Sequence, residues 1–547
     1  MPDPTRALRL AAGTPTMLRV LAGAGVLRAY PPLRLVRVAR TLAAWGMGPA
    51  GGFAAMAILE PDRPCVVDER GTLTFGELDV RSDRLADCLS TQGVGPGDGI
   101  AVMCRNHRGF VDVSLAAAKI GADLVYLNTA FAGPQLLEVL VRESPALVVH
   151  DAEFEGLLAG SDVRRVLAWV DEPDPDALTL ESLVEAGDPG RRTPPRRRSR
   201  IVILTSGTTG APKGAPRSDA GIEAATALLS RLPLRAGWRS HVAAPLFHTW
   251  GWAHFALSML LGSAIVLRRR FDPEDCLRTV TEEECDSLVV IPVMLQRILA
   301  LPKETLDSYD LSRVRVVATS GSSLPGDLAN AWMDQFGDHL YNVYGSTEVA
   351  YASVASPAEL RASPGTAGRP PYATVVRILD DDGTELPRGR VGRIFVGNRI
   401  LFEGYTGGGS RDVVDGLMAT GDVGRFDGDG RLVVEGRDDE MIVSGGENVF
   451  PNEVEDVLVR HEGVADAAAV GVADKDYGQR LRAFVVRAVG SDVSEAELKD
   501  HVRSRLARFK VPREIVFLDE LPRNATGKIL KRALVSDHSH PPTEEHP

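Results

Sequence analysis

A glycine- and hydroxyl-rich stretch, Thr205 to Gly214, most constrains what this chain can fold into. It follows the apolar run Ile201 to Leu204, whose length and β-branched content predict a buried strand. The glycines let backbone N–H groups approach an anion, the hydroxyls can donate hydrogen bonds, and Lys213 supplies a positive charge. The pattern predicts a phosphate-binding loop at a strand end, although a flexible surface turn has a similar composition.

The P-loop is the first alternative within phosphate chemistry. That motif needs a glycine immediately before the lysine and a serine or threonine immediately after it. Pro212 and Gly214 stand at these two positions, so the P-loop is excluded.

Length and charge limit the classes of protein that fit. A chain of 547 residues exceeds one hydrophobic core, so two or more domains are expected. The net charge of −12 argues against nucleic acid as the main partner, because phosphate backbones require a basic face. The five cysteines show no CxxC spacing, which predicts reduced thiols in a cytoplasmic protein rather than a metal site.

Helix and strand signals alternate along the first half of the chain. Thr74 and Glu77 have the spacing of a capping box, which predicts the start of a helix. A second helix is predicted over 115–120, ended by Gly121 and followed by a strand over 123–127. Such alternation predicts a parallel sheet covered by helices.

Three further segments carry groups suited to a nucleotide. Val316 to Pro325 is typical of a strand, a glycine-rich turn and a helix start. In Tyr341 to Glu348 an aromatic ring can stack on adenine, a hydroxyl can bind phosphate and a carboxylate can bind Mg²⁺. Near the C-terminus, Leu521 to Lys528 ends in a lysine that could offset the charge of a leaving pyrophosphate.

Together these motifs resemble those of the adenylate-forming enzymes, in particular the fatty acyl-CoA synthetases. The resemblance covers roughly residues 65–534 and implies ATP, Mg²⁺ and coenzyme A as cofactors and substrates. It implies catalytic roles for Lys528, Thr347, Glu348 and His248, with Glu348 as the metal ligand. It also implies that the nucleotide and coenzyme A are bound by Thr205, Ser206, Gly207, Thr208, Thr209, Gly210, Lys213, Gly321, Ser322, Ser323, Asn342, Tyr344, Gly345, Ser346, Thr347, Asp422, Arg437, Gly445 and Gly446.

The acyl pocket is assigned by the same resemblance to Ala244 through Trp252. His248, Trp250, Gly251, Trp252 and Gly321 are the pocket residues that it implies. The apolar side chains that follow could enclose an alkyl chain or simply fill the core. Because no charged residue other than histidine lies between His241 and Arg268, an apolar acid is favoured over an amino acid, whose ammonium would need a buried carboxylate.

The resemblance also implies a domain that turns between two half-reactions. Asp439 matches the hinge position, and Gly445 and Gly446 match a loop that borders the pantetheine tunnel after the turn. The acid would first form acyl-AMP, and the coenzyme A thiol would then attack it.

The N-terminal segment, residues 1–58, has seven arginines and one acidic residue. The arginines of Leu33 to Arg40 recur every three residues, which gathers them toward one side of a predicted helix. Two interpretations stay open. The helix could lie on an anionic membrane surface, or it could pack on its own catalytic domain with the arginines in solvent.

The predicted fold is α/β, with a large N-terminal domain of two parallel-type sheets, a small β-barrel subdomain and a small mobile C-terminal domain. The predicted boundaries are an arm at 1–58, domains at 59–438 and 439–535, and a disordered tail at 536–547. The predicted activity is conversion of a medium- or long-chain fatty acid to its acyl-CoA by a cytoplasmic monomer or homodimer, with peripheral contact at the inner membrane face left open. The alternatives are a fatty acyl-AMP ligase that serves a carrier protein, and a non-catalytic membrane-associated protein with the same fold.

Overall fold

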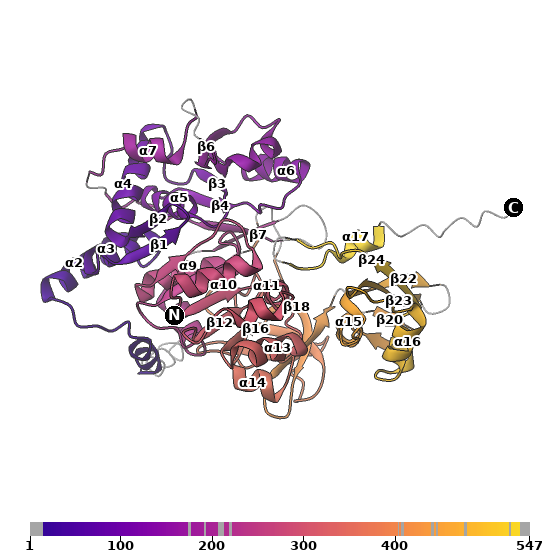
Figure 1. Ribbon diagram of the computed structural model, residues 1–547. Helices are drawn as coiled ribbons and strands as arrows, with labels where there is room; N and C mark the ends of the chain where they lie inside the picture. The colour runs from indigo at the N-terminus through magenta and orange to yellow at the C-terminus, as the bar shows by residue number, and fades with distance from the viewer. Residues whose placement is uncertain are drawn as a thin grey trace.

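The computed structural model describes most of the chain. The described residues are 15–172, 177–190, 193–205, 213–217, 221–402, 404–405, 410–438, 442–444, 447–474, 478–524 and 527–536. Figure 1 shows a large N-terminal body and a smaller C-terminal domain beside it.

Two sheets form the core of the N-terminal body. The first has the strand order β6-β5-β3-β4-β7-β8, and all its pairs are parallel except β7 with β8. Its strands are β3 (Gly99–Met103), β4 (Asp123–Tyr126), β5 (Leu147–Asp151), β6 (Arg164–Trp169), β7 (Ile201–Thr205) and β8 (Lys213–Arg217). The strand predicted before the glycine-rich loop is therefore confirmed as β7.

The second sheet has the order β14-β13-β12-β11-β9-β10-β1-β2, with antiparallel pairs only at its two edges. Its strands are β1 (Pro64–Asp68), β2 (Gly71–Thr74), β9 (Arg239–Val242), β10 (Ala264–Val266), β11 (Ser287–Val290), β12 (Val316–Thr319), β13 (Leu340–Tyr344) and β14 (Ser353–Ala355). The inner strands are buried almost throughout, as expected for parallel strands covered on both faces.

Helices cover these sheets, and two predicted helix boundaries are confirmed. The Thr74–Glu77 capping box starts α4, and Gly121, in the left-handed conformation, ends α5. The covering helices are α4 (Phe75–Thr91), α5 (Arg108–Ile120), α6 (Gly133–Glu143), η1 (Ala152–Leu158), α7 (Leu180–Ala186), α8 (Gly221–Leu229), α9 (Thr249–Leu261), α10 (Pro273–Glu282), α11 (Pro292–Leu299), α12 (Lys303–Asp307), α13 (Gly326–Phe336) and α14 (Pro357–Ala362).

A five-stranded antiparallel sheet follows the second sheet in the chain and forms the small β subdomain. Its strands are β15 (Val375–Leu379), β16 (Gly392–Gly397), β17 (Val413–Val414), β18 (Leu417–Phe426) and β19 (Leu432–Arg437). The pairing of β18 with β19 places Asp422 opposite Arg437.

The C-terminal domain has its own sheet and its own hydrophobic core. The sheet orders its strands as β21-β20-β23-β22, and β24 runs parallel to β23. The elements are β20 (Ile442–Ser444), β21 (Glu447–Val449), α15 (Pro451–Val459), β22 (Val464–Asp474), β23 (Gly478–Arg487), α16 (Glu495–Arg503), η3 (Arg508–Lys510), β24 (Glu514–Leu518) and α17 (Lys531–Ser536).

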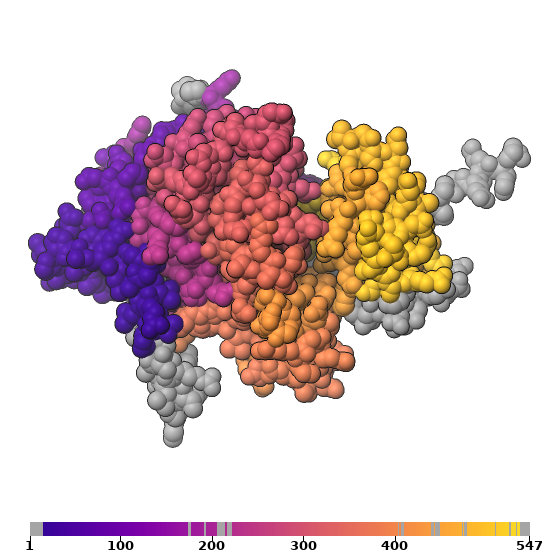
Figure 2. Space-filling model, turned by 60° about the horizontal axis from the view of Figure 1, so that its bottom comes forward, coloured from indigo at the N-terminus to yellow at the C-terminus, as the bar shows by residue number. Residues whose placement is uncertain are grey.

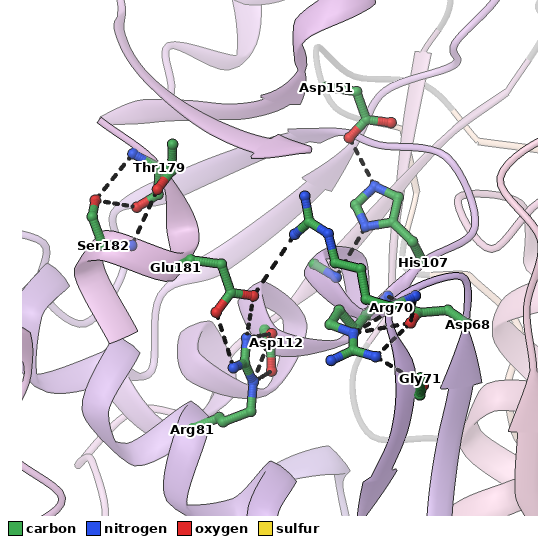
Figure 3. Close-up of polar contacts among 12 residues, drawn as sticks. Asp68, Arg70, Gly71, Arg81, His107, Asp112, Asp151, Thr179, Glu181 and Ser182 are labelled. Carbon is green, nitrogen blue, oxygen red and sulfur yellow. Dashed lines mark hydrogen bonds and ion pairs between the residues drawn. The ribbon is translucent and has the colours of Figure 1, made fainter. Parts of the chain in front are cut away.

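Figure 3 shows a buried ionic network at the junction of β1, α4, α5 and α7. Arg81 lies 2.8 Å from both Asp112 and Glu181, and Arg108 lies 2.6 Å from Asp68. Such paired charges offset the cost of removing each ion from water, so they hold these elements in one arrangement.

A neighbouring cluster brings together Cys104, His107 and Asp151, a set of side chains that could ligate a metal. His107 Nε2 lies 2.7 Å from Asp151 Oδ1, and its Nδ1 accepts a hydrogen bond from the Gly109 amide. The Cys104 thiol lies 3.7 Å from the Val149 carbonyl oxygen. Because these atoms are already partnered within the protein, we interpret the cluster as structural.

The N-terminal arm contains a helix over residues 15–23, then α2 (Pro32–Trp45) and α3 (Pro49–Leu59). The α2 range confirms the predicted helix around Leu33 to Arg40. Phe53 of α3 is buried and stacks on Phe255 with ring centroids 5.2 Å apart, so α3 belongs to the core of the body. Among the described residues, the helices are too short or too polar to traverse a bilayer.

Candidate active site

A cavity of about 2000 Å³ extends from the N-terminal arm, through the body, to the C-terminal domain. Residues at the carboxyl ends of β12 and β13 line it, and these two strands are parallel neighbours. Ligands in α/β proteins commonly bind at this end of the strands, because the loops that follow adjacent strands meet there.

The predicted phosphate loop is described only at its two ends. β7 and β8 pair so that Thr205 lies opposite Lys213, which makes the intervening residues the connection of a hairpin. Leu204 lines the cavity, so this hairpin reaches the candidate site. Ser206, Gly207, Thr208, Thr209 and Gly210 lie outside the described residues, and only the backbone of Thr205 and Lys213 is described.

The predicted nucleotide residues at the carboxyl ends of β12 and β13, and in the segments just after them, line the cavity. They are Gly321, Ser322, Ser323, Asn342, Tyr344, Gly345, Ser346, Thr347 and Glu348. Gly345 is required for a steric reason, since a Cβ there would lie 2.2 Å from the carbonyl oxygen of Ala350. Gly321 has φ +100°, which disfavours any residue with a side chain.

Tyr344, Asp422 and Arg437 form a connected group at the cavity wall. The Tyr344 hydroxyl donates to Asp422 Oδ2 at 2.5 Å, and Arg437 Nη1 donates to Asp422 Oδ1 at 3.3 Å. Burial raises the pKa of Asp422, and Arg437, Tyr344 and Lys528 offset this effect only in part. The hydrogen bond to Asp422 orients the Tyr344 ring along the cavity.

Glu348 is held by two residues that the sequence patterns did not identify. Its carboxylate accepts a hydrogen bond from the Tyr405 hydroxyl at 2.6 Å and one from Arg411 Nη2 at 3.3 Å. Burial alone would raise the pKa of Glu348, but Tyr405 and Arg411 bring it below its ordinary value. Glu348 is therefore an ionised carboxylate with only 6% of its surface exposed.

Lys528 reaches the same cavity from the C-terminal domain. Its loop is shaped by Asn524, which accepts from the Lys528 amide through its side chain and donates its own amide to the Lys528 carbonyl, both at 2.9 Å. Gly527 packs on the body so closely that a Cβ would lie 2.4 Å from Val293 Cγ1. The positive charge of Lys528 acts to lower the pKa of Asp422, so the two domains contribute to one electrostatic environment.

Among the described residues, two hydrogen bonds also connect the domains. The Gln296 side chain donates to the Ala465 carbonyl at 3.2 Å, and Arg460 Nε donates to Asp327 Oδ2 at 2.8 Å. The predicted hinge residue Asp439 and the predicted loop residues Gly445 and Gly446 lie outside the described residues.

The predicted acyl residues lie at the start of α9. His248 is the residue before the helix, and its ring contacts that of Phe247 with centroids 4.5 Å apart. Trp250 and Trp252 both line the cavity. Trp252 packs against Tyr126, and Trp250 is buried and donates its indole N–H to the Val290 carbonyl at 3.0 Å. Gly251 faces the preceding loop instead, because a Cβ there would lie 2.3 Å from the Pro245 carbonyl oxygen.

Burial lowers the pKa of His248 to about 4 and that of His254 to about 3. Both side chains are therefore neutral near pH 7. Among the residues that the structure describes, none is a hydrogen-bond partner of His248 Nε2, although this atom is buried in the wall of the cavity.

We expect acidification to destabilise the fold through these histidines. The pKa of His254 is lower in the folded than in the unfolded state. Above pH 6.5 the side chain is neutral in both states. Below that pH the unfolded state binds a proton that the folded state excludes, so the free energy of unfolding falls. Each buried histidine of this kind should lower the free energy of unfolding by about 1.4 kcal/mol per pH unit below pH 6.5. His254→Phe keeps an aromatic contact with Trp250 and should reduce the slope of stability against pH, measured as the denaturation midpoint from pH 7 to 5. An unchanged slope would contradict the lowered pKa of His254.

Comparison with known proteins identifies the family. A family model described as AMP-binding enzyme matches residues 53–406, and one described as AMP-binding enzyme C-terminal domain matches residues 453–528. The chain belongs to the adenylate-forming enzymes. A feruloyl-CoA synthase of an Amycolatopsis species is 34% identical over 489 residues, which are 87% of this chain and 96% of that protein.

Two further relatives of this adenylate-forming enzyme are informative. A fatty acid–[acyl-carrier-protein] ligase, ScoC of Streptomyces coeruleorubidus, is 30% identical over 87% of this chain and 93% of that protein. The structure of o-succinylbenzoate CoA synthetase of Bacillus subtilis in complex with ATP and magnesium ion is similar, with a TM-score of 0.77 and 28% identity over 88% of this chain and 98% of that chain.

These findings establish the reaction class of this adenylate-forming enzyme. It is an AMP-forming acid–thiol ligase, with ATP and coenzyme A as substrates and Mg²⁺ as the metal typical of the family. The predicted fold class is confirmed as well, with mixed α/β sheets in a large N-terminal domain and a small C-terminal domain. The comparisons support a general acid–CoA ligase and leave the acid itself to be argued from the cavity.

Proposed function

We propose that this ligase activates a medium- or long-chain fatty acid and transfers the acyl group to coenzyme A. The observation that carries the proposal is the course of the cavity along α9. Trp252, Ala253 and Ala256 line its middle part, and Met259 and Leu260 line the part next to the N-terminal arm. A helix of this length spans about 18 Å, which suits an extended alkyl chain.

Apolar side chains of two other elements line the cavity as well. They are Ile222, Ala225 and Leu228 of α8 and Ile203 of β7. Burial of each methylene in such surroundings contributes about 0.8 kcal/mol, so binding should strengthen as the chain lengthens.

In the proposed first half-reaction, the acid lies with its carboxylate near His248 and its chain along α9. Neutral His248 adds no charge beside the carboxylate, and Trp252 covers the first part of the chain. The Lys528 ammonium offsets negative charge that develops between the carboxylate oxygen and the α-phosphate. Asp422 would accept from the ribose hydroxyls, and Arg437 would keep Asp422 ionised.

Glu348 fits the requirements of a magnesium ligand. Mg²⁺ prefers oxygen donors and is commonly bound by one or two carboxylates together with substrate phosphates. Glu348 offers an ionised carboxylate at the cavity wall, adjacent to Thr347, whose hydroxyl would bind phosphate. The bound ion would supply positive charge to the triphosphate.

The second half-reaction requires a different domain arrangement. In the proposed mechanism Lys528 and the thiol must reach the same reacting centre at different times, so we propose that the C-terminal domain turns about Asp439 before coenzyme A attacks. The loop with Gly445 and Gly446 would then border the pantetheine arm.

An aromatic acid is the second candidate, because a feruloyl-CoA synthase is among the relatives. Such an acid would occupy only the end of the cavity near His248 and leave the part between Ala256 and Leu260 unfilled. A carrier protein is likewise the second candidate for the acceptor, because ScoC is among the relatives.

A substrate panel tests the proposal. Purified protein with ATP, Mg²⁺ and coenzyme A should release AMP faster with dodecanoate or palmitate than with ferulate, indoleacetate or acetate. A preference for an aromatic acid would refute the fatty acid. Formation of acyl-AMP without thioester would instead indicate a carrier protein as acceptor.

We expect Ala256→Trp to shorten the accepted chain. The indole would fill the middle of the cavity, so kcat/KM for palmitate should fall by about two orders of magnitude while that for butanoate changes little. Val375→Trp, at an exposed position on β15, is the matched control. Equal loss for both acids would show that Ala256 does not lie along the chain.

A further inference from the structure

The N-terminal arm includes a helix, α2, that lies on the surface of the body. None of its residues is buried. It is tethered at its start by two contacts, from Arg34 Nη1 to the Leu59 carbonyl at 2.8 Å and from Tyr30 to Glu60 at 3.1 Å. In Figure 1, α2 lies at the edge of the molecule remote from the C-terminal domain, and Figure 2 shows the same indigo segment projecting from the body.

The helix α2 combines exposed apolar residues with exposed arginines. Leu33 is 73% exposed, and Leu35 and Val36 are exposed as well. Arg37 and Arg40 are exposed on the same helix. Isolated exposed apolar residues are common on proteins, but several of them beside arginines on one helix are typical of segments that lie on membranes.

The charge of this region is opposite to that of the whole chain. Residues 15–59 contain five arginines and no aspartate or glutamate, whereas the chain carries a net charge of −12. A basic region on an acidic protein directs that region toward an anionic surface and orients the molecule as it approaches.

The turn between α2 and α3 lies at one end of the acyl cavity. Trp45, Met47 and Pro49 line that end, and Met47 is 43% exposed, so the cavity reaches the protein surface there. Arg198 lines the same rim, and its guanidinium packs so closely on Gly46 that a Cβ there would lie 2.7 Å from Arg198 Cζ.

The first part of the arm precedes the segment that the family model matches. That model begins at residue 53, after α2 and after this turn. Both features therefore lie outside the matched segment.

From these observations we infer that α2 and the α2–α3 turn dock on a membrane surface rich in anionic lipid, and that the acid enters the cavity from that surface past Trp45 and Met47. Only the entry of the acid from the membrane rests on the proposed fatty-acid substrate; the docking of α2 does not. Arginines would pair with lipid phosphates, and Leu33 and Val36, which share one side of the helix, would insert among the acyl chains. An acid entering carboxylate-first would reach His248 with its tail still toward the arm.

Vesicle binding tests the docking surface independently of catalysis. The full-length protein should co-sediment with phosphatidylglycerol vesicles, but not with phosphatidylcholine vesicles, and high salt should release it. The double variant Arg37→Glu, Arg40→Glu should weaken binding by about tenfold or more. Leu33→Ser with Val36→Ser should weaken it as well, with less dependence on salt.

The matched control carries the same charge change elsewhere. Arg377→Glu with Arg390→Glu alters two exposed arginines of the small β subdomain and should leave binding unchanged. Circular dichroism and thermal unfolding of each variant exclude misfolding as the cause. Failure of the wild-type protein to bind phosphatidylglycerol vesicles, or equal loss in arm and control variants, would overturn the docking surface.

Comparing a fatty acid in solution with one supplied in vesicles tests whether the acid enters from the membrane. The arm variants should turn over octanoate in solution at the wild-type rate, and should be slower only with palmitate supplied in phosphatidylglycerol vesicles. Equal rates with vesicle-borne palmitate would overturn entry from the membrane. A wild-type protein that binds vesicles but rejects every fatty acid in the substrate panel would refute the proposed substrate and with it the entry route, while the docking surface would stand.

Discussion

Lys528→Ala is expected to slow formation of acyl-AMP by about two to three orders of magnitude, the cost of losing one preorganised charge at a reacting centre. Lys528 is the group that the C-terminal domain contributes beside Asp422, and its loop is positioned by Asn524 and by the contact of Gly527 with Val293. Conversion of separately prepared acyl-AMP to acyl-CoA should remain close to the wild-type rate, because the charge serves only the departure of pyrophosphate.

The measurement is ATP–pyrophosphate exchange for the first half-reaction and thioester formation from acyl-AMP for the second. Lys499→Ala is the control, since Lys499 lies on α16 of the same domain, is paired with Glu495 and does not line the cavity. Equal loss of both half-reactions would contradict the role proposed for Lys528.

Glu348→Gln is expected to reduce adenylation by about a hundredfold and to raise the Mg²⁺ concentration needed for half-maximal rate. The substitution keeps the size of the side chain and removes its charge. It also leaves Arg411 without its carboxylate partner beside the triphosphate. A Mg²⁺ titration of ATP–pyrophosphate exchange checks the result, and an unchanged requirement for Mg²⁺ would show that Glu348 does not hold the metal.

Tyr405→Phe is the matched variant for Glu348→Gln, because it keeps the Glu348 carboxylate and removes one hydrogen bond to it. The Tyr405 hydroxyl contributes to lowering the pKa of Glu348, so its loss should raise that pKa. Glu348 would then be protonated at a higher pH, and the acidic limb of the activity profile should move upward. The effect on the rate near pH 7 should be only a few-fold.

Much of the candidate site could be predicted because its residues lie in contiguous motifs. Gly321 to Ser323 follow β12, and Asn342 to Glu348 include the end of β13 and the residues after it. Adjacent parallel strands bring such segments to one sheet edge. The residues of Leu521 to Lys528 could be identified by their order, although their contact with the body could not. The proposed roles of these residues await the experiments above.

Tyr405 and Arg411 show why the rest could not be predicted. They lie in an irregular segment with no periodic pattern, and their importance comes from their reach to Glu348 across the chain. The same limit applies to α9. Its sequence is largely apolar around its circumference, so no periodicity separates the residues that face the cavity, such as Ala256, from those that face the core, such as Phe255.

By itself, the sequence determined the α/β class, the strand before the phosphate loop, the helix caps and the family, because local hydrogen bonding and hydrophobic periodicity depend on neighbours in the chain. Only the tertiary structure decided the partners of Glu348, the register that sets Asp422 opposite Arg437, and the extension of the acyl cavity to the arm. These features depend on contacts between residues remote in sequence, whose positions follow from the packing of the whole body.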